Sequence, residues 1–170
     1  DDDIIIHGAL GSFDISEQKP DACTAKNGFE ESDKASETSL HAFGGSQVYS
    51  YTFDYSYQLP VTEDGRRTYN IGLSARSFRG AQIPNGYGSY IFAVYIDGQT
   101  EPVGEFEIRA DEIAYNKGSI KIQLVDGQHT IRFKWKNPNS FVSVEIGEII
   151  VEDAKYDARA DLNNDGKVDD

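Results

Sequence analysis

The sequence lacks several features that would assign its class directly. It has no methionine and a single cysteine, Cys23, in 170 residues, which excludes an internal disulfide framework. It also has no Asn-x-Ser/Thr acceptor for N-glycosylation. No apolar run approaches the length of a membrane span, which argues against membrane insertion. Because no signal peptide is visible and position 1 is not methionine, we expect an extracellular or cell-surface protein whose signal peptide has been removed.

Basic residues are also scarce. The chain has 16 Lys and Arg against 29 Asp and Glu, a net charge of −13 and a pI near 4.5. Such a surface repels nucleic-acid phosphates and anionic lipids, so neither is an expected partner. Acidity of this size favours solubility or affinity for divalent cations. The length corresponds to one domain that can bury its own core.

Alternation of large apolar and polar residues is the main structural signal. It runs through 49–59, 69–75 and 131–135, and a period of two is that of a β-strand with one buried face. The segment 88–96 is apolar on both faces, as in the middle of a sandwich. Further strands are expected near 103–109, 119–125 and 141–152.

Turn signals separate these runs. Asp-Gly pairs occur at 64–65, 97–98 and 126–127. Gly147 is expected to mark a bulge where the apolar phase shifts. No long segment has a period of 3.6, so helix is confined to short pieces, such as one within 20–38. The sequence therefore predicts an all-β fold, an antiparallel two-sheet jelly-roll sandwich of eight to nine strands with little helix.

Three segments divide the chain. We expect an N-terminal strand at 1–12, the jelly-roll domain at 13–153 and an acidic tail at 154–170. Within the domain, Trp135 alternates in phase with apolar neighbours and is expected in the core, as is the tyrosine stripe that begins at Tyr49.

The order of strand and turn motifs carries a family resemblance. V-Y-S-Y-T-F is followed by R-T-Y-N-I-G-L-S-A-R, V-Y-I-D-G, L-V-D-G-Q-H-T-I-R-F and V-E-I-G-E-I-I-V. Over residues 45–152 this order resembles the galactose-binding-like jelly rolls, which include many carbohydrate-binding modules of secreted glycoside hydrolases. The resemblance implies a structural calcium held by acidic residues near the ends of the domain. Glu145 and Glu148 lie near where the last such ligand would fall.

The chain ends in D-L-N-N-D-G-K-V-D-D, which is most of a calcium-binding loop. Oxygen ligands recur at alternate positions around a glycine that permits the sharp turn, and Lys167 would contribute its carbonyl. The predicted calcium ligands are Asp161, Asn163, Asp165, Lys167 and Asp169. The loop resembles EF-hand loops and the first loop of dockerin modules. It lacks the carboxylate at position twelve, the following helix and the second copy, so cohesin binding is not implied; a solvated acidic tail is the other interpretation.

From Ile4 to Leu10 the N-terminal segment is apolar on both faces apart from His7. One interpretation is a first strand inside its own sandwich. The other is strand donation, in which this segment completes the sheet of a neighbouring copy and builds an open filament. The predicted assembly residues are Ile4, Ile5, Ile6 and Leu10.

Catalytic motifs are missing from the sequence. The histidines His7, His41 and His129 are scattered, and neither a nucleophile elbow nor a phosphate-binding glycine loop occurs. His129 starts a strand and is expected to be structural. We therefore predict that the protein is not an enzyme. The residues favour a sugar-binding loop instead, with candidate contacts at Arg79, Asn85, Tyr87 and Tyr90.

Two functional hypotheses follow. The first is a structural subunit of a self-assembling surface filament or layer, a homopolymer that uses strand donation and calcium. The alternative is a carbohydrate-binding module that contacts polysaccharide, part of a secreted, dockerin-bearing glycoside hydrolase or adhesin.

Overall fold

The computed structural model describes residues 13–14, 23–32 and 39–154. In this part of the chain it contains strands and one 3-10 turn, η3, at Phe78–Gly80. The strands are β1 Phe13–Asp14, β2 Cys23–Asn27, β3 Phe29–Glu31, β4 Leu40–Phe43, β5 Thr52–Leu59, β6 Arg66–Arg76, β7 Ser89–Ile96, β8 Gly104–Arg109, β9 Asn116–Val125, β10 Gly127–Trp135 and β11 Ser143–Asp153.

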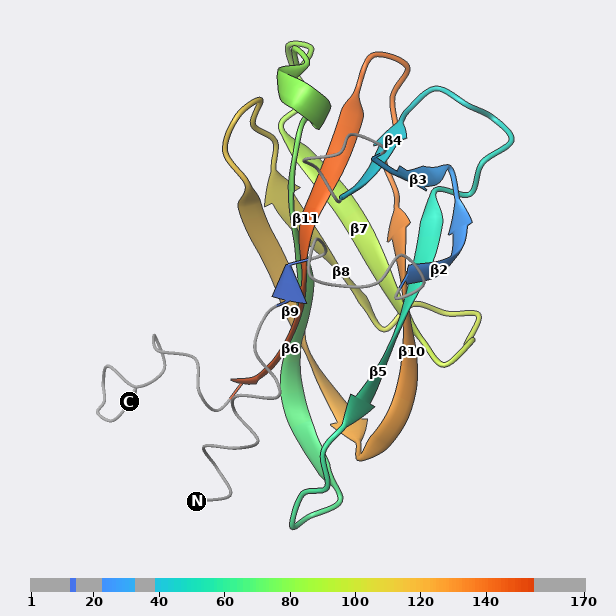
Figure 1. The fold of residues 1–170 in the computed structure, drawn as a ribbon, viewed down its shortest axis with the longest axis vertical. Helices are drawn as coiled ribbons and strands as arrows, with labels where there is room; N and C mark the ends of the chain where they lie inside the picture. The colour runs from blue at the N-terminus through green and yellow to red at the C-terminus, as the bar shows by residue number, and fades with distance from the viewer. Residues whose placement is uncertain (1–12, 15–22, 33–38, 155–170) are drawn as a thin grey trace, which may run out of the picture.

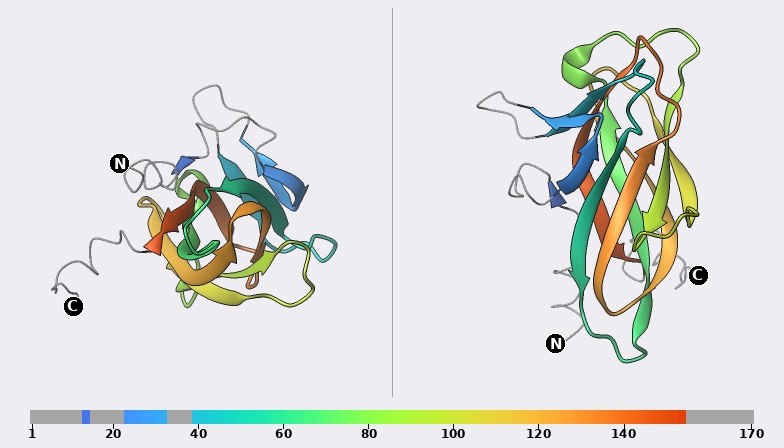
Figure 2. Two further views of the ribbon diagram at one scale, coloured as in Figure 1. Left: turned by 90° about the horizontal axis from the view of Figure 1, so that it is seen from below. Right: turned by 90° about the vertical axis from the view of Figure 1, so that its right-hand side faces the viewer.

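The strands form two antiparallel sheets that face each other (Figures 1 and 2). One sheet has the order β3-β4-β11-β6-β9, with β1 paired to β11, and the other has the order β2-β5-β10-β7-β8. The predicted all-β jelly-roll sandwich is thus confirmed. The core between the two sheets contains side chains from both, among them Phe53 and Phe133 from one sheet and Tyr69 from the other, each with no exposed surface.

The described part of the chain has more strands than the eight or nine predicted, because β1 to β4 are too short to show alternation. The helix considered within 20–38 is wrong where the chain is described, since this segment contains β2 and β3. Most side chains of β2 are exposed, so its extended form depends on pairing with β5 at Cys23↔Tyr55 rather than on its own pattern.

Two local predictions have different outcomes. The bulge at Gly147 is confirmed, because the pairing of β11 with β6 shifts between Ile146 and Glu148. The core stripe begins later than expected, since Tyr49 is 49% exposed whereas Tyr51 is 2% exposed. The positive φ of Tyr51, 58°, turns the backbone just before β5 begins, which takes Tyr49 off the strand.

Several loops gather at one end of the sandwich, the top in Figure 1, which we call the loop end. They are the β4–β5 connection, the segment around η3 and the β10–β11 connection. Hydrogen bonds join them: Gly44 N donates to Val142 O at 2.8 Å, and Phe78 N donates to Ser143 Oγ at 3.2 Å.

Candidate functional site

A groove of about 730 Å³ lies on the outer face of the sheet that contains β5, β10 and β7. Odd-numbered residues of β5 and β10 face the core, so even-numbered ones point outward and form the floor of the groove. The β7–β8 connection adds further lining residues. The lining residues are Ser50, Thr52, Asp54, Tyr95, Asp97, Gly98, Gln99, Thr100, Thr130, Arg132 and Lys134.

Strand register arranges the floor in transverse rows. Asp54 on β5 pairs with Arg132 on β10, and Arg132 pairs with Tyr95 on β7, so these three form the central row. The next row contains Thr52 and Lys134. Residues that alternate along a strand lie about 7 Å apart and neighbouring strands about 4.8 Å apart. The floor is therefore wide enough for a short chain of small rings and too wide to coordinate a single ion.

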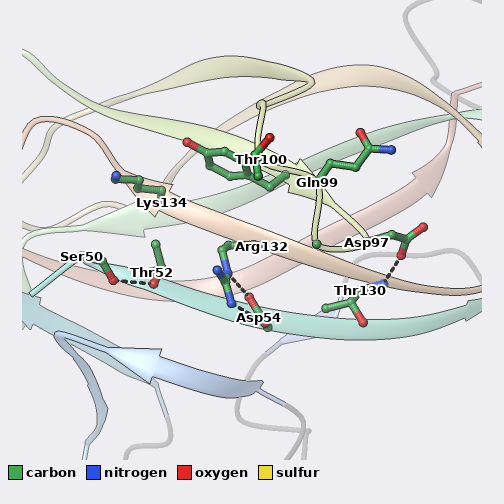
Figure 3. Close-up of a pocket in the computed structure, with 11 residues that line it drawn as sticks. Ser50, Thr52, Asp54, Asp97, Gln99, Thr100, Thr130, Arg132 and Lys134 are labelled. Atoms are coloured by element: carbon green, nitrogen blue, oxygen red, sulfur yellow. Dashed lines mark hydrogen bonds and ion pairs between the residues drawn. The ribbon is translucent and has the colours of Figure 1, made fainter.

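Asp54 and Arg132 form a bidentate ion pair at the centre of the floor (Figure 3). Arg132 Nε donates to Asp54 Oδ1 at 2.7 Å, and Nη2 donates to Oδ2 at 3.1 Å. The hydrogen bonds with Asp54 raise the pKa of Arg132 above its ordinary value. A guanidinium carries five N–H donors, so Arg132 keeps donors for a ligand while Asp54 holds it in place.

Asp97 fixes one end of the groove. Its Oδ1 accepts a hydrogen bond from Thr130 N at 2.9 Å, and its Oδ2 lies 2.7 Å from His129 Nδ1. The other ring nitrogen of His129 lies 2.7 Å from Val125 O. His129 is 6% exposed, so it joins two turns and does not face the groove, as a structural histidine should. These bonds hold the wall of the groove in position.

The sequence-predicted sugar loop is only partly at the surface. Arg79 and Asn85 are exposed, and Tyr87 is half-buried, with its hydroxyl donating to Asn137 O at 2.9 Å. Burial raises the pKa of Tyr87 to about 12, so the hydroxyl stays neutral. Tyr90 has no exposed surface and donates to Ser143 O at 3.1 Å.

Tyr90 therefore cannot stack against a sugar, which corrects the prediction for this residue. Its ring alternates in phase with Phe92, Val94 and Ile96, all of which are buried. Because β7 is apolar on both faces, the sequence does not show which face is buried, and the structure places the face that carries Tyr90 in the core. The groove residues Asp54, Arg132 and Tyr95 were missed because their proximity depends on register between strands far apart in the chain.

The loop end carries exposed aromatic rings that were also not predicted. Phe43 is 59% exposed and Phe141 is 80% exposed. The Phe43 ring contacts that of Phe78 in a T-shaped arrangement, with centroids 5.6 Å apart. Each of the two exposed rings is a place on which a flat apolar ligand face can lie.

The predicted ligands of the calcium loop and the predicted assembly strand lie outside the described residues. Within 23–32 and 39–154, no group of three His, Cys, Asp or Glu side chains could hold a metal ion. Glu145 accepts hydrogen bonds from Ser39 Oγ and Arg76 Nε, and Glu148 lies 3.4 Å from Lys117 Nζ. Both carboxylates are thus occupied by protein partners.

Comparison with known proteins gives a fold but no family. No protein-family model matches the chain. No curated protein matches it either. In the described part of the chain, no helix is long and apolar enough to cross a membrane.

Three similar solved structures are carbohydrate-active proteins or their modules. A family 35 carbohydrate-binding module from an environmental isolate has 11% identity and a TM-score of 0.54, over 84% of this chain and 93% of that one. The carbohydrate-binding module CBM36 in complex with calcium and xylotriose has 13% identity and a TM-score of 0.52, over 83% and 98%.

The third is a Paenibacillus sp. cycloisomaltooligosaccharide glucanotransferase complexed with cycloisomaltoheptaose, at 12% identity and a TM-score of 0.54. The match covers 85% of this chain but only 19% of that enzyme. At such identities the likeness shows the fold, the β-jelly roll found in carbohydrate-binding modules.

Proposed function

We propose that the chain is a non-catalytic, extracellular carbohydrate-binding module that holds a polysaccharide in the groove over β5, β10 and β7. The central row of Asp54, Arg132 and Tyr95 is the observation that carries the proposal. A sugar ring presents an apolar face of C–H groups and a rim of hydroxyls that both donate and accept. The row supplies a carboxylate acceptor, a guanidinium donor and an aromatic side chain on three neighbouring strands.

The similar structures support this function over a filament subunit. Two of them are carbohydrate-binding modules that match this chain over nearly their whole length. The homopolymer hypothesis has no comparable support, and Ile4, Ile5, Ile6 and Leu10, on which it depends, lie outside the described residues.

Removing the aromatic side chain of the groove tests the proposal. We expect Tyr95→Ala to weaken binding at least about tenfold, because a half-buried ring at the centre of a contact carries a large share of its energy. Electrophoresis in gels that contain xylan, mannan or a β-glucan measures the retardation of each variant. Tyr95 lies on the outer face of its strand, so circular dichroism and the melting temperature should stay close to those of the parent protein.

Phe141→Ala is the matched control, because it removes an exposed ring at the loop end. Retardation of Phe141→Ala equal to that of the parent supports the groove. Loss in Phe141→Ala with no change in Tyr95→Ala would move the site to the loop end. Absence of retardation on every polysaccharide would refute the proposed function.

Calcium is a separate part of the proposal. We propose that Asp161, Asn163, Asp165, Asp169 and the carbonyl of Lys167 bind it in the tail, consistent with CBM36 being in complex with calcium. Excess chelator is expected to leave polysaccharide binding unchanged. The reason is that no group of three His, Cys, Asp or Glu side chains among the described residues, those lining the groove included, could hold a metal ion. Calorimetry should detect a calcium site that Asp161→Ala or Asp165→Ala removes. Retardation lost in chelator would contradict the separation of metal and groove.

A further inference from the structure

Both ring nitrogens of His129, at one end of the groove, face oxygen acceptors. Nδ1 lies 2.7 Å from Asp97 Oδ2, and Nε2 lies 2.7 Å from Val125 O. A carbonyl oxygen and an ionised carboxylate accept hydrogen bonds and do not donate them, so each of these bonds requires a proton on the ring nitrogen. A neutral imidazole carries one such proton, and an imidazolium carries two. The arrangement of acceptors is therefore that of a site for a charged ring.

Loss of one ring proton breaks one of the two bonds in either tautomer. With the remaining proton on Nε2, the bond to Val125 O is kept and the lone pair of Nδ1 points at the carboxylate of Asp97. With the proton on Nδ1, the lone pair of Nε2 points at the carbonyl instead. Because His129 is buried, water does not readily replace the lost partner. The neutral ring therefore fits this site less well, and one of the two turns that it joins has to move.

The charges around His129 leave Asp97 as its ionic partner. Among the described residues, the titratable groups on the surrounding strands and turns are Tyr57 of β5, Arg67 and Tyr69 of β6, Asp97 after β7 and Asp126 after β9. Burial raises the pKa of both tyrosines, so their hydroxyls stay neutral. Asp126 accepts hydrogen bonds from the β5–β6 connection, and Arg67 forms an ion pair with the end of β11.

Asp97 connects the state of this ring to the groove. Its carboxylate also accepts a hydrogen bond from Thr130 N at 2.9 Å, and its own N donates to Thr130 O at 2.8 Å (Figure 3). The backbone φ of Asp97 is 52°, in the left-handed region that residues other than glycine rarely adopt. The bonds of the carboxylate stabilise this conformation, and the residues that follow, 98–100, line the groove. Release of Asp97 by His129 therefore changes the groove wall.

We infer that His129 is a positioning residue whose second ring proton holds the end of the groove in shape, so that the affinity for polysaccharide falls as the pH rises. This inference rests on the proposed function and describes the regulation of the same site. The charged ring keeps Asp97 and the groove wall in place, and a rising pH removes that charge. Coupling between two ligands is reciprocal, so a bound polysaccharide should also keep the second proton on the ring to a higher pH.

Two measurements on the same samples test the inference, from about pH 5.5 to about pH 9, a range above the ordinary titration of aspartate and across that of histidine. NMR spectra of the ring nitrogens show whether one or both carry a proton, and His129→Gln assigns the signals. Affinity electrophoresis in the neutral xylan, mannan or β-glucan that retards the parent protein gives the dissociation constant. We expect this constant to rise at least about fivefold over the pH interval in which His129 loses its second proton.

Three variants identify the group that titrates. In Asp97→Asn the side-chain amide can donate to the lone pair of Nδ1, so a neutral ring with its proton on Nε2 makes both bonds and the affinity should no longer fall with pH. His129→Gln removes the titrating group and should also give a flat profile. His41→Gln is the matched control, because His41 lies on β4 in the other sheet, and it should keep the profile of the parent protein.

A dissociation constant that stays the same while the ring loses its proton would overturn the inference and leave the proposed function standing. The same holds for a ring that carries a single proton throughout the range. A pH dependence that persists in His129→Gln would overturn the role of this histidine, and Asp97→Asn supplies the same test if His129→Gln does not fold. If no polysaccharide retards the protein at any pH, the proposed function fails and the inference fails with it, whatever the ring spectra show.

Discussion

Trp135→Ala is expected to lower the free energy of unfolding by about 3–5 kcal/mol, because it deletes the largest side chain of the core. Trp135 is 1% exposed and its ring packs edge-on against Tyr51 and Tyr90, with centroids 5.3 and 6.2 Å apart. Its indole N–H donates to Tyr87 Oη at 3.0 Å and Asn137 Oδ1 at 3.1 Å. The substitution thus leaves both a cavity and polar groups that have lost a donor. Urea denaturation followed by fluorescence of the tyrosines or by circular dichroism measures the loss.

Trp135→Phe distinguishes the contribution of packing to stability from that of the indole hydrogen bonds. It keeps most of the ring but removes the N–H, and a cost of about 1–2 kcal/mol is expected. Tyr87 and Asn137 connect this tryptophan to the loop between η3 and β7, so the loop should loosen in both variants. A loss below about 1 kcal/mol in Trp135→Ala would show that the residue is not part of the core. Weakened sugar binding without loss of stability would instead make it a binding platform.

The sequence predicts β5, β6 and β10 well because the alternation in each of these strands marks its buried face. Phe53 and Phe133 belong to alternating runs, and the structure places both in the core. Asp126 belongs to a predicted Asp-Gly turn and also accepts hydrogen bonds from the backbone N and the hydroxyl of Thr62, at 2.7 and 2.8 Å. Alternation and turn residues are sufficient to predict the fold class, since both are properties of short segments.

The candidate site was harder to predict because it is a product of register. Alternation indicates that Arg132 and Lys134 face outward, and this is what the structure shows. It does not indicate that Asp54, 78 residues away, lies opposite Arg132. Tyr95 was hidden for another reason: its strand is apolar on both faces, so no phase distinguishes the one tyrosine that reaches the surface. Long-range pairing of this kind is not encoded in any single segment.

The sequence also does not show which carboxylates are already paired. Glu145 was a candidate for the last ligand of a structural calcium, on the basis of the family resemblance. In the structure it is 2% exposed, and its two oxygens accept hydrogen bonds from Arg76 Nε at 3.1 Å and Ser39 Oγ at 3.0 Å. Arg76 also donates to Ile113 O at 2.8 Å and lies 4.2 Å from the centroid of the Tyr115 ring. The cation that balances Glu145 is thus a side chain of the protein, positioned by the β8–β9 connection.

Arg76→Met should therefore lower the free energy of unfolding by about 3 kcal/mol, because a buried carboxylate loses its cation and keeps only a hydroxyl donor. The double variant that combines Arg76→Met with Glu145→Gln is expected to be more stable than Arg76→Met alone. A neutral amide is less costly to bury than an unpaired charge. Urea denaturation of the two variants and the parent protein measures both effects.

The surface pair of Lys117 with Glu148 provides the control. Lys117 is 62% exposed and Glu148 is 29% exposed, so Lys117→Met should change stability by less than about 1 kcal/mol. If Arg76→Met cost no more than Lys117→Met, the buried pair would not be a structural ion pair. If added calcium restored the stability of Arg76→Met but not that of the double variant, Glu145 would be able to bind the metal once its own cation is gone. We expect no such rescue, because Glu145 belongs to no group of three His, Cys, Asp or Glu side chains among the described residues that could hold a metal ion, and calcium needs six to eight oxygen ligands.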